Sequence, residues 1–136
     1  MTLTCYQLSK KIFQAWKEKN PENLLPLFRE DYVDHTAPPD APPGLDWVKM
    51  QYEIYTTAFP DIHFEIIDVV EDGDRVGERI TVTGTHQGDL MGIPPTGKRV
   101  EVPVMAIHRA EDGKYVEAWF YLDEMTLMQQ LGVIPS

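Results

Sequence analysis

The alternation of apolar and polar residues is clearest near the end of the chain, between Gly113 and Gly132. The first half of this stretch alternates with a period of two, which is typical of a β-strand with two different faces. The second half changes to apolar residues three apart, which predicts a short helix that stops at Gly132. One strand face is apolar, and the other carries aromatic and acidic residues: Tyr115, Glu117, Trp119, Tyr121 and Asp123.

Helical spacing dominates the first half of the chain. Apolar residues three or four apart predict a helix from Thr2 to Lys19, and Asn20-Pro21 starts a second one that Pro26 keeps short or bent. A third helix is predicted to begin with Asp46 as its cap and to end at Phe59, because the residue before a proline avoids helical angles. The proline-rich segment 38–44 predicts a loop.

Strand patterns dominate the second half. A short strand is predicted over 32–36, and four longer runs follow over 62–70, 75–86, 99–109 and 115–122. The segment 88–97 reads as a long irregular loop that either covers a pocket or only connects two strands. Helices followed by a strand meander predict a single α+β domain over 1–136, in which a curled antiparallel sheet packs on the helices and leaves a ligand pocket between them.

Composition narrows the classes of partner. The chain has 136 residues and a formal charge of −10, with no basic run, which argues against nucleic acid and anionic membranes as partners. The single cysteine, Cys5, excludes an intrachain disulfide and a cysteine-based zinc cluster. The four histidines show no metal-binding spacing, so we predict no metal site. Without an apolar run long enough for a bilayer, we predict a cytoplasmic protein.

Several short motifs follow one another along most of the chain: Val33-Asp34-His35, Ala58-Phe59-Pro60-Asp61, Arg79, Gly84-Thr85-His86-Gln87-Gly88, Pro95-Thr96-Gly97-Lys98, Asp112-Gly113-Lys114, Val116-Glu117-Ala118-Trp119, Asp123 and Gln130-Leu131-Gly132. In this order they resemble the motifs of the SnoaL-like polyketide cyclases, a family within the nuclear transport factor two-like superfamily. The resemblance implies a cone-shaped α+β fold (also called cystatin-like) and ring closure of a polyketide by intramolecular aldol condensation without a cofactor.

The resemblance also implies catalytic roles for particular residues. Asp123 falls on the family's acid/base aspartate, and His35 falls on its early cavity histidine. In this scheme Asp123 takes a proton from a carbon next to a carbonyl, and His35, with His86 or Tyr121, stabilises the enolate oxygen. His63 and His108 are assigned to ordinary surface or sheet positions.

Asp123 has a second interpretation. A catalytic carboxyl needs a largely dry pocket to raise its pKa, and Trp119 and Tyr121 on the same face would provide that environment. However, Asp123 also precedes the last helix, where aspartate is a preferred cap and accepts backbone N–H bonds that lower its pKa. Spacing alone favours the cap, and the family resemblance favours the acid/base role.

The register of the last two strands decides which residues accompany Asp123. The preferred register places Met105 opposite Trp119 and Glu101 opposite Asp123, because it separates polar from apolar faces. The apolar face would then lie outside and favour a homodimer. The alternative, a two-residue turn at Asp112-Gly113, places His108 opposite Glu117 and mixes the faces.

Candidate substrate-binding residues follow from the same face and from the third helix. A pocket for a small hydrophobic molecule would use six side chains: Trp119, Tyr121, Arg79, Met105, Tyr52 and Trp47. Each has an ordinary alternative, since the aromatic residues would also fit a core and Arg79 would also fit a structural ion pair. The function classes that remain are a cyclase, an isomerase or epoxide-hydrolase-like enzyme of the same fold, and a non-catalytic protein that binds a hydrophobic ligand.

Overall fold

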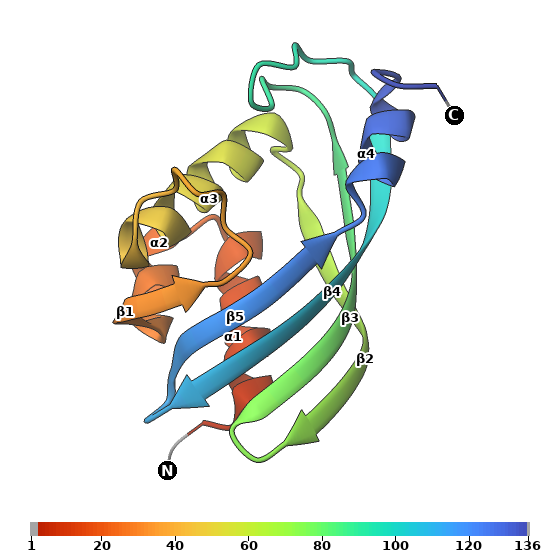
Figure 1. Cartoon of the computed structure of the whole chain (residues 1–136). Coiled ribbons are helices and arrows are strands. Elements are labelled where there is room, and N and C mark those ends of the chain that lie inside the picture. The colour runs from red at the N-terminus through yellow and green to blue at the C-terminus, as the bar shows by residue number, and fades with distance from the viewer. Residues whose placement is uncertain (1–2, 136) are drawn as a thin grey trace.

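The sheet forms one layer of the molecule. A computed structural model describes residues 3–135 and contains five strands in the order β1-β5-β4-β3-β2. β2, β3, β4 and β5 pair antiparallel, and the short β1 pairs parallel with β5. Figure 1 shows the long strands curving around the helices. The strands are β1 (Phe28–Asp34), β2 (His63–Asp72), β3 (Arg75–Thr85), β4 (Arg99–Glu111) and β5 (Lys114–Leu122).

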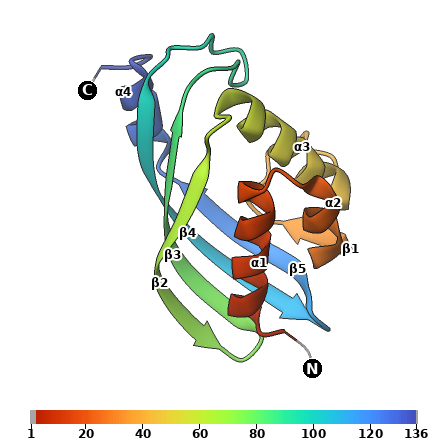
Figure 2. The ribbon, with the colours of Figure 1, turned by 180° about the vertical axis from the view of Figure 1, so that it is seen from behind.

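The helices cover the concave side of the sheet, and Figure 2 shows α1 lying across it. α1 starts after Thr4, whose hydroxyl accepts the backbone N–H of Gln7, while the Gln7 side chain accepts the N–H of Thr4. The predicted start at Thr2 lies outside the described residues. The helices are α1 (Cys5–Lys17), α2 (Pro21–Leu24), the 3-10 turn η1 (Leu25–Leu27), α3 (Gly44–Ala58) and α4 (Glu124–Leu131).

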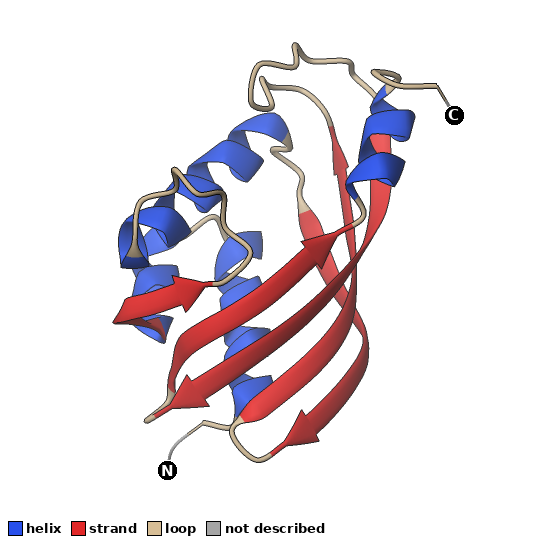
Figure 3. Cartoon of the chain, viewed as in Figure 1, coloured by secondary structure: helices blue, strands red, loops and turns tan. Residues whose placement is uncertain are grey.

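The α+β prediction is confirmed, and Figure 3 shows the helices on one side of the strand meander. The start of α3 differs from the prediction. The helix begins at Gly44 after Pro43, and Asp46 lies in its first turn instead of capping it. Gly44 has φ +62°, and a Cβ there would lie 2.5 Å from the Glu30 carbonyl oxygen, so only glycine fits this entry. The negative charge of Asp46 in the first turn still stabilises the helix by interacting with the helix dipole.

The β4–β5 register differs from both predicted alternatives. The chain turns at Asp112-Gly113, and a bulge between Arg109 and Ala110 then shifts the pairing, so Met105 lies opposite Tyr121. Asp123 donates its backbone N–H to the Pro103 carbonyl instead of pairing with Glu101. The predicted separation of polar and apolar faces is present. The bulge adds one residue to β5 after the two-residue turn, and the resulting pairing differs from the preferred register by two residues, which preserves alternation.

The prediction of which face lies inside is wrong. The apolar residues of β4 and β5 face the helices, whereas the face with Met105 and Tyr121 is the outer one: Val104 is 1% exposed and Tyr121 63%. Apolar residues of α1, such as Leu8 and Ile12, pack in one cluster with sheet residues. The more apolar face buries more apolar area against these helices, and this decides the orientation.

Within the described part of the chain, none of the helices combines the length and apolar character needed to cross a bilayer.

Candidate functional site

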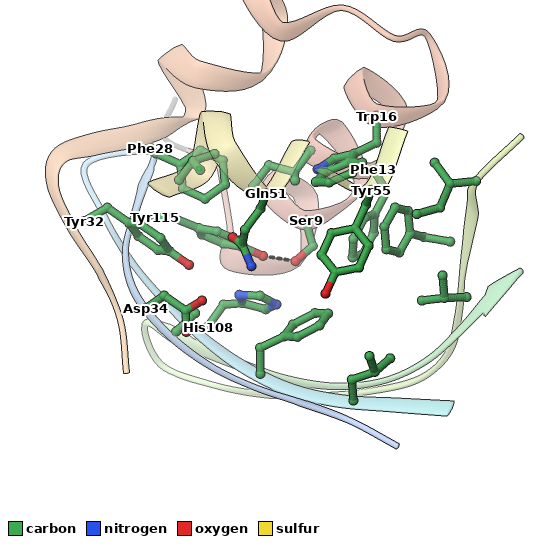
Figure 4. Close-up of a pocket in the computed structure, with 18 residues that line it drawn as sticks. Ser9, Phe13, Trp16, Phe28, Tyr32, Asp34, Gln51, Tyr55, His108 and Tyr115 are labelled. Carbon is green, nitrogen blue, oxygen red and sulfur yellow. Dashed lines mark hydrogen bonds between the residues drawn. The ribbon is translucent and has the colours of Figure 1, made fainter. Parts of the chain in front are cut away.

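A cavity lies between the helices and the concave face of the sheet. It holds about 870 Å³ of space free of atoms, part of it in a mouth open to solvent. Its wall is mostly apolar and aromatic, and polar groups enter from α1, β1, α3, β4 and β5 (Figure 4). A mostly apolar cavity with a few convergent polar groups is typical of a small-molecule site. The polar or titratable lining residues are Ser9, Tyr32, Asp34, Gln51, Tyr55, His108 and Tyr115.

Two of these residues meet through the sheet register. Asp34 of β1 and His108 of β4 both pair with Ala118 of the intervening strand β5. Each strand is about 4.8 Å from the next, so the two backbones lie about 10 Å apart. The small side chain of Ala118 leaves space above it for the carboxylate and the imidazole, and Figure 4 shows both on the sheet side of the cavity.

Three hydrogen bonds fix the Asp34 carboxylate. Oδ1 accepts the backbone N–H and the hydroxyl of Thr36, at 2.9 and 2.7 Å, and Oδ2 accepts the indole Nε1–H of Trp47 at 2.9 Å. A carboxylate oxygen has two lone-pair positions, so Oδ2 keeps one for a ligand. The side chain is only half-buried, which leaves that oxygen at the cavity.

His108 is held in a buried polar cluster. Its ring stacks on Tyr115, with centroids 4.5 Å apart and planes 9° from parallel. Nε2 lies 3.2 Å from Oε1 of Glu78, a carboxylate that is 1% exposed on β3. Oε1 of Glu78 also accepts the Ser9 hydroxyl at 2.9 Å. The cluster therefore places an imidazole, whose ordinary pKa is near neutrality, between a carboxylate and the cavity.

Two tyrosine hydroxyls point into the cavity, those of Tyr32 and Tyr55 (Figure 4). Burial raises the pKa of Tyr32, and the charge of Asp34 raises it further. Burial likewise raises the pKa of Tyr55, with smaller contributions from Glu124 and Asp34. Both groups therefore stay protonated over the physiological pH range and can donate hydrogen bonds to a ligand oxygen.

The comparisons with known proteins agree with this architecture. The model of the SnoaL-like polyketide cyclase family matches residues 7–131. The chain belongs to this family. It is also 22% identical to the aklanonic acid methyl ester cyclase DnrD of Streptomyces peucetius, in an alignment 138 positions long that covers 95% of this chain and 91% of the relative.

Two solved structures extend the comparison. AclR from Streptomyces galilaeus, a proposed hydroxylase, is 32% identical, with a TM-score of 0.82 over 96% of this chain and 82% of its own. IdmH from Streptomyces antibioticus, a proposed polyketide cyclase, is 30% identical, with a TM-score of 0.80 over 93% of this chain and 97% of its own. The family's cone-shaped fold is therefore confirmed for this chain.

Asp123 lies outside the lining of the cavity. Its carboxylate caps α4, accepting the backbone N–H of Thr126 at 3.1 Å and its hydroxyl at 2.7 Å. These two bonds, the hydroxyl first, hold the pKa of Asp123 below its usual range. The dry surroundings expected for a cavity base are absent at this exposed position. The bulge and the inverted faces explain the difference, because they put Trp119 and Tyr121 on the outer face.

His35 lies on the outer face as well, because it follows Asp34 by one residue at the end of a strand. Its ring stacks on Trp119 with centroids 4.5 Å apart, and its Nε2 lies 2.7 Å from Glu117. Arg79 forms an exposed ion pair with Asp68 on this face at 2.6 Å. The four predicted residues Trp119, Tyr121, Arg79 and Met105 therefore lie together around a hollow on the outer face. The prediction that they line the cavity between the helices and the sheet is wrong, since outer strand positions cannot reach it.

The other predicted site residues lie near the cavity or away from it. His86 is fully buried, and its Nδ1 accepts the backbone N–H of Thr96 at 3.2 Å, which anchors the loop over 88–97. Tyr52 packs in the core against Trp16. Trp47 contacts the site through its bond to Asp34. None of these three side chains is on the cavity wall, because α3 lines it with Gln51 and Tyr55, and Tyr52 packs against α1 instead.

The sequence offered a signal for the residues that were missed. On β3, Glu78 interrupts an inward series of apolar residues, and on β4 His108 does the same. A titratable residue at an inward-facing, otherwise apolar position of a strand needs buried hydrogen-bond partners, so it is a candidate for a functional site. Asp34 lies in the motif Val33-Asp34-His35, in which the family resemblance implies a role for His35 instead. Among residues 3–135, no three His, Cys, Asp or Glu side chains gather closely enough to hold a metal ion.

Proposed function

We propose that the protein is a polyketide cyclase that closes a ring in a small hydrophobic carbonyl compound by cofactor-free intramolecular aldol condensation. The observation that carries the proposal is the meeting of one carboxylate and one imidazole, Asp34 and His108, over Ala118 in an apolar cavity. Membership of the SnoaL-like polyketide cyclase family supports the reaction class. Such a pair can remove a proton at one point of a substrate and deliver one at another.

In the proposed reaction, Oδ2 of Asp34 takes a proton from the carbon next to a substrate carbonyl. The resulting enolate oxygen accepts hydrogen bonds from the hydroxyls of Tyr32 and Tyr55. The enolate carbon then attacks a second carbonyl of the same molecule, and a carbon–carbon bond forms. The new alkoxide takes a proton from the protonated His108 ring. Proton exchange with solvent returns Asp34 and His108 to their starting states.

The cavity supplies the rest of the catalysis. Its aromatic and aliphatic wall favours a folded apolar chain, so two carbonyl-bearing segments are held close together. Low polarity around the reacting atoms also strengthens hydrogen bonds to the developing negative charge. The alternative base, Asp123, is the residue implied by the family resemblance, and its position at the start of α4 makes it a separate and testable candidate.

The experiment compares two aspartates. Wild type, Asp34→Asn and Asp123→Asn are incubated with aklanonic acid methyl ester and other polyketide carbonyl compounds, and the ring-closed product is followed by chromatography and mass spectrometry. We expect Asp34→Asn to lower kcat/KM by about 10²- to 10⁴-fold, the usual contribution of a positioned acid or base. Asp123→Asn should change it by less than about tenfold, because asparagine is also a good helix cap.

The reverse order of effects would identify Asp123 as the base and exclude Asp34. Tight binding of the compounds by wild type without any turnover would instead support a non-catalytic binding protein. The role of Asp123 as a helix cap is the feature that would favour a non-catalytic binding protein. The convergence of Asp34, His108 and two tyrosine hydroxyls favours an enzyme.

We also propose that the protein is cytoplasmic and forms a homodimer through the outer face of the sheet. Apolar side chains gather there, including Val70, Met105, Ile107 and Tyr121, each more than 40% exposed. A contiguous apolar surface of this kind favours association. The proposed dimer therefore still forms through the sheet, as the sequence predicts. It would use the outer face with Met105 and Tyr121 instead of the apolar face, which the helices cover. Light scattering after size exclusion, on wild type and on Ile107→Lys, tests the assembly.

A further inference from the structure

We propose that Glu78 is a positioning residue of the cavity site. Its buried carboxylate holds Nε2 of His108, selects one tautomer of the ring, and leaves Nδ1 as the nitrogen that exchanges a proton with the ligand. The inference rests on the proposed function of the cavity, in which His108 is the proton donor.

The first support is the burial of Glu78. Its side chain is wholly enclosed, and Oε2 makes no hydrogen bond to any described residue. A buried carboxylate without a counter-charge costs several kcal/mol, so proteins retain one where it has a charged partner or a task. The neighbouring group that can supply a positive charge is His108.

The second support is a hydrogen-bonded chain that fixes the carboxylate. The Ser9 hydroxyl donates to Oε1 of Glu78 at 2.9 Å, which leaves the Ser9 oxygen to accept the hydroxyl of Tyr115. Figure 4 shows the link between Tyr115 and Ser9 beside the His108 ring. Each bond in such a chain polarises the next, so Oε1 of Glu78 is held as an acceptor facing His108.

The third support is the geometry of His108. The Tyr115 ring stacks on one side of the imidazole, and Nε2 lies 3.2 Å from Oε1 of Glu78. This contact is close but poorly aligned, and neither ring nitrogen forms a hydrogen bond with a described residue. Contacts of catalytic groups are often loose without substrate and tighten when it binds. Nδ1 therefore has no competing partner among residues 3–135.

The proton balance is simple. With Nε2–H held by Glu78, protonated His108 gives its Nδ1 proton to the substrate alkoxide and becomes the neutral Nε2–H tautomer. In this scheme Glu78 keeps its negative charge, which balances the positive charge of the His108 ring while the ring is protonated. The other titratable groups around this pair are Cys5 on α1, Tyr32 and Asp34 on β1, and Tyr115 on β5. Burial raises the pKa of Cys5 to about 12, so the thiol stays neutral.

The chain contains a matched control on the other side of the sheet. Glu117 pairs with His35 at 2.7 Å on the outer face. Glu78→Gln and Glu117→Gln therefore make the same chemical change beside a histidine inside and outside the cavity. Glutamine keeps the size of the side chain but can donate or accept, so it no longer dictates a tautomer.

The experiment is nitrogen-15 NMR of the histidine rings, which needs no substrate. In wild type we expect neutral His108 as the Nε2–H tautomer. Glu78→Gln should convert it to a mixture, whereas Glu117→Gln should leave His108 unchanged and alter only His35. An Nδ1–H tautomer in wild type, or an unchanged His108 in Glu78→Gln, would overturn the proposal. The wild-type spectrum gives a decision even where Glu78→Gln fails to fold.

Kinetics provides the second readout. Loss of the carboxylate should lower kcat by about tenfold or more with little change in KM, because the effect arises in proton transfer and not in binding. The alkaline limb of the pH–rate profile should also move to lower pH, because protonated His108 loses its counter-charge. A cyclase whose kcat and pH profile ignore Glu78→Gln would disprove the positioning role alone. A tautomer change in a protein without cyclase activity would support it and reject the proposed function.

Discussion

Each face of the sheet carries one histidine–glutamate pair, and the two pairs differ in their surroundings. Inside, His108 and Glu78 lie 3.2 Å apart, with side chains 9% and 0% exposed. Outside, His35 and Glu117 lie 2.7 Å apart, with side chains 39% and 20% exposed. Glu117 also accepts the guanidinium of Arg109, and His35 rests on Trp119.

The comparison shows that distance alone does not determine what a pair does. The outer pair is closer, but water screens it and Arg109 binds the same carboxylate. The attraction between His35 and Glu117 therefore contributes little to stability. The Arg109 and His35 bonds together hold the pKa of Glu117 below its usual range. The inner pair has fewer partners and a less polar environment, so its electrostatic interactions are stronger. A change of charge on this pair therefore alters both the stability of the fold and the binding of a ligand.

The largest difference between the two pairs should be in stability. Glu78→Ala leaves His108 and Ser9 without their buried partner and should lower the free energy of unfolding by about 3–5 kcal/mol, whereas exposed pairs contribute about 0–1 kcal/mol. Urea unfolding of Glu78→Ala and Glu117→Ala measures both. Equal losses would mean that the inner pair is as well solvated as the outer one.

A smaller effect should follow from filling the space above Ala118. Ala118→Leu pushes a branched side chain between Asp34 and His108, which should cost about 1–3 kcal/mol of stability and abolish ligand binding and turnover. The outer-face control is Met105→Leu, which keeps volume and leaves the cavity untouched. Calorimetric binding and urea unfolding test the pair of variants. Retained binding in Ala118→Leu would place the ligand elsewhere.

The smallest effect concerns the exposed carboxylate Asp123. Asp123→Ala removes the cap of α4 and should lower the urea midpoint slightly at neutral pH, while Asp123→Asn should not. Because the folded-state pKa of Asp123 is lowered, its stabilisation is present above the ordinary carboxyl range and disappears as the pH falls through the lowered value. The unfolding curves of wild type and Asp123→Ala should therefore converge in acid. A difference that grows in acid would contradict the cap.

The sequence predicted the elements because their causes are local. Periods of two and of three to four, glycine and proline positions, and the capping residues are properties of neighbouring side chains. The four long strands and the helices on either side of them follow from these patterns. The start of α3 was misplaced because Asp46 suits a cap and the first turn equally well.

Only the tertiary structure decided which face became the inside. Because side chains alternate along a strand, Asp34 and His35 point to opposite faces of the sheet, and so do Phe120 and Tyr121. The alternation does not show which residue of each pair faces the helices. The bulge between Arg109 and Ala110 set the register, and packing against α1 selected the more apolar face. Asp34, His108 and Glu78 come together only because β1, which is far from the other two strands in the sequence, aligns with β4 through Ala118, while Val76 of β3 pairs with His108. Such long-range pairing has no local signature, since it depends on burial summed over the whole sheet.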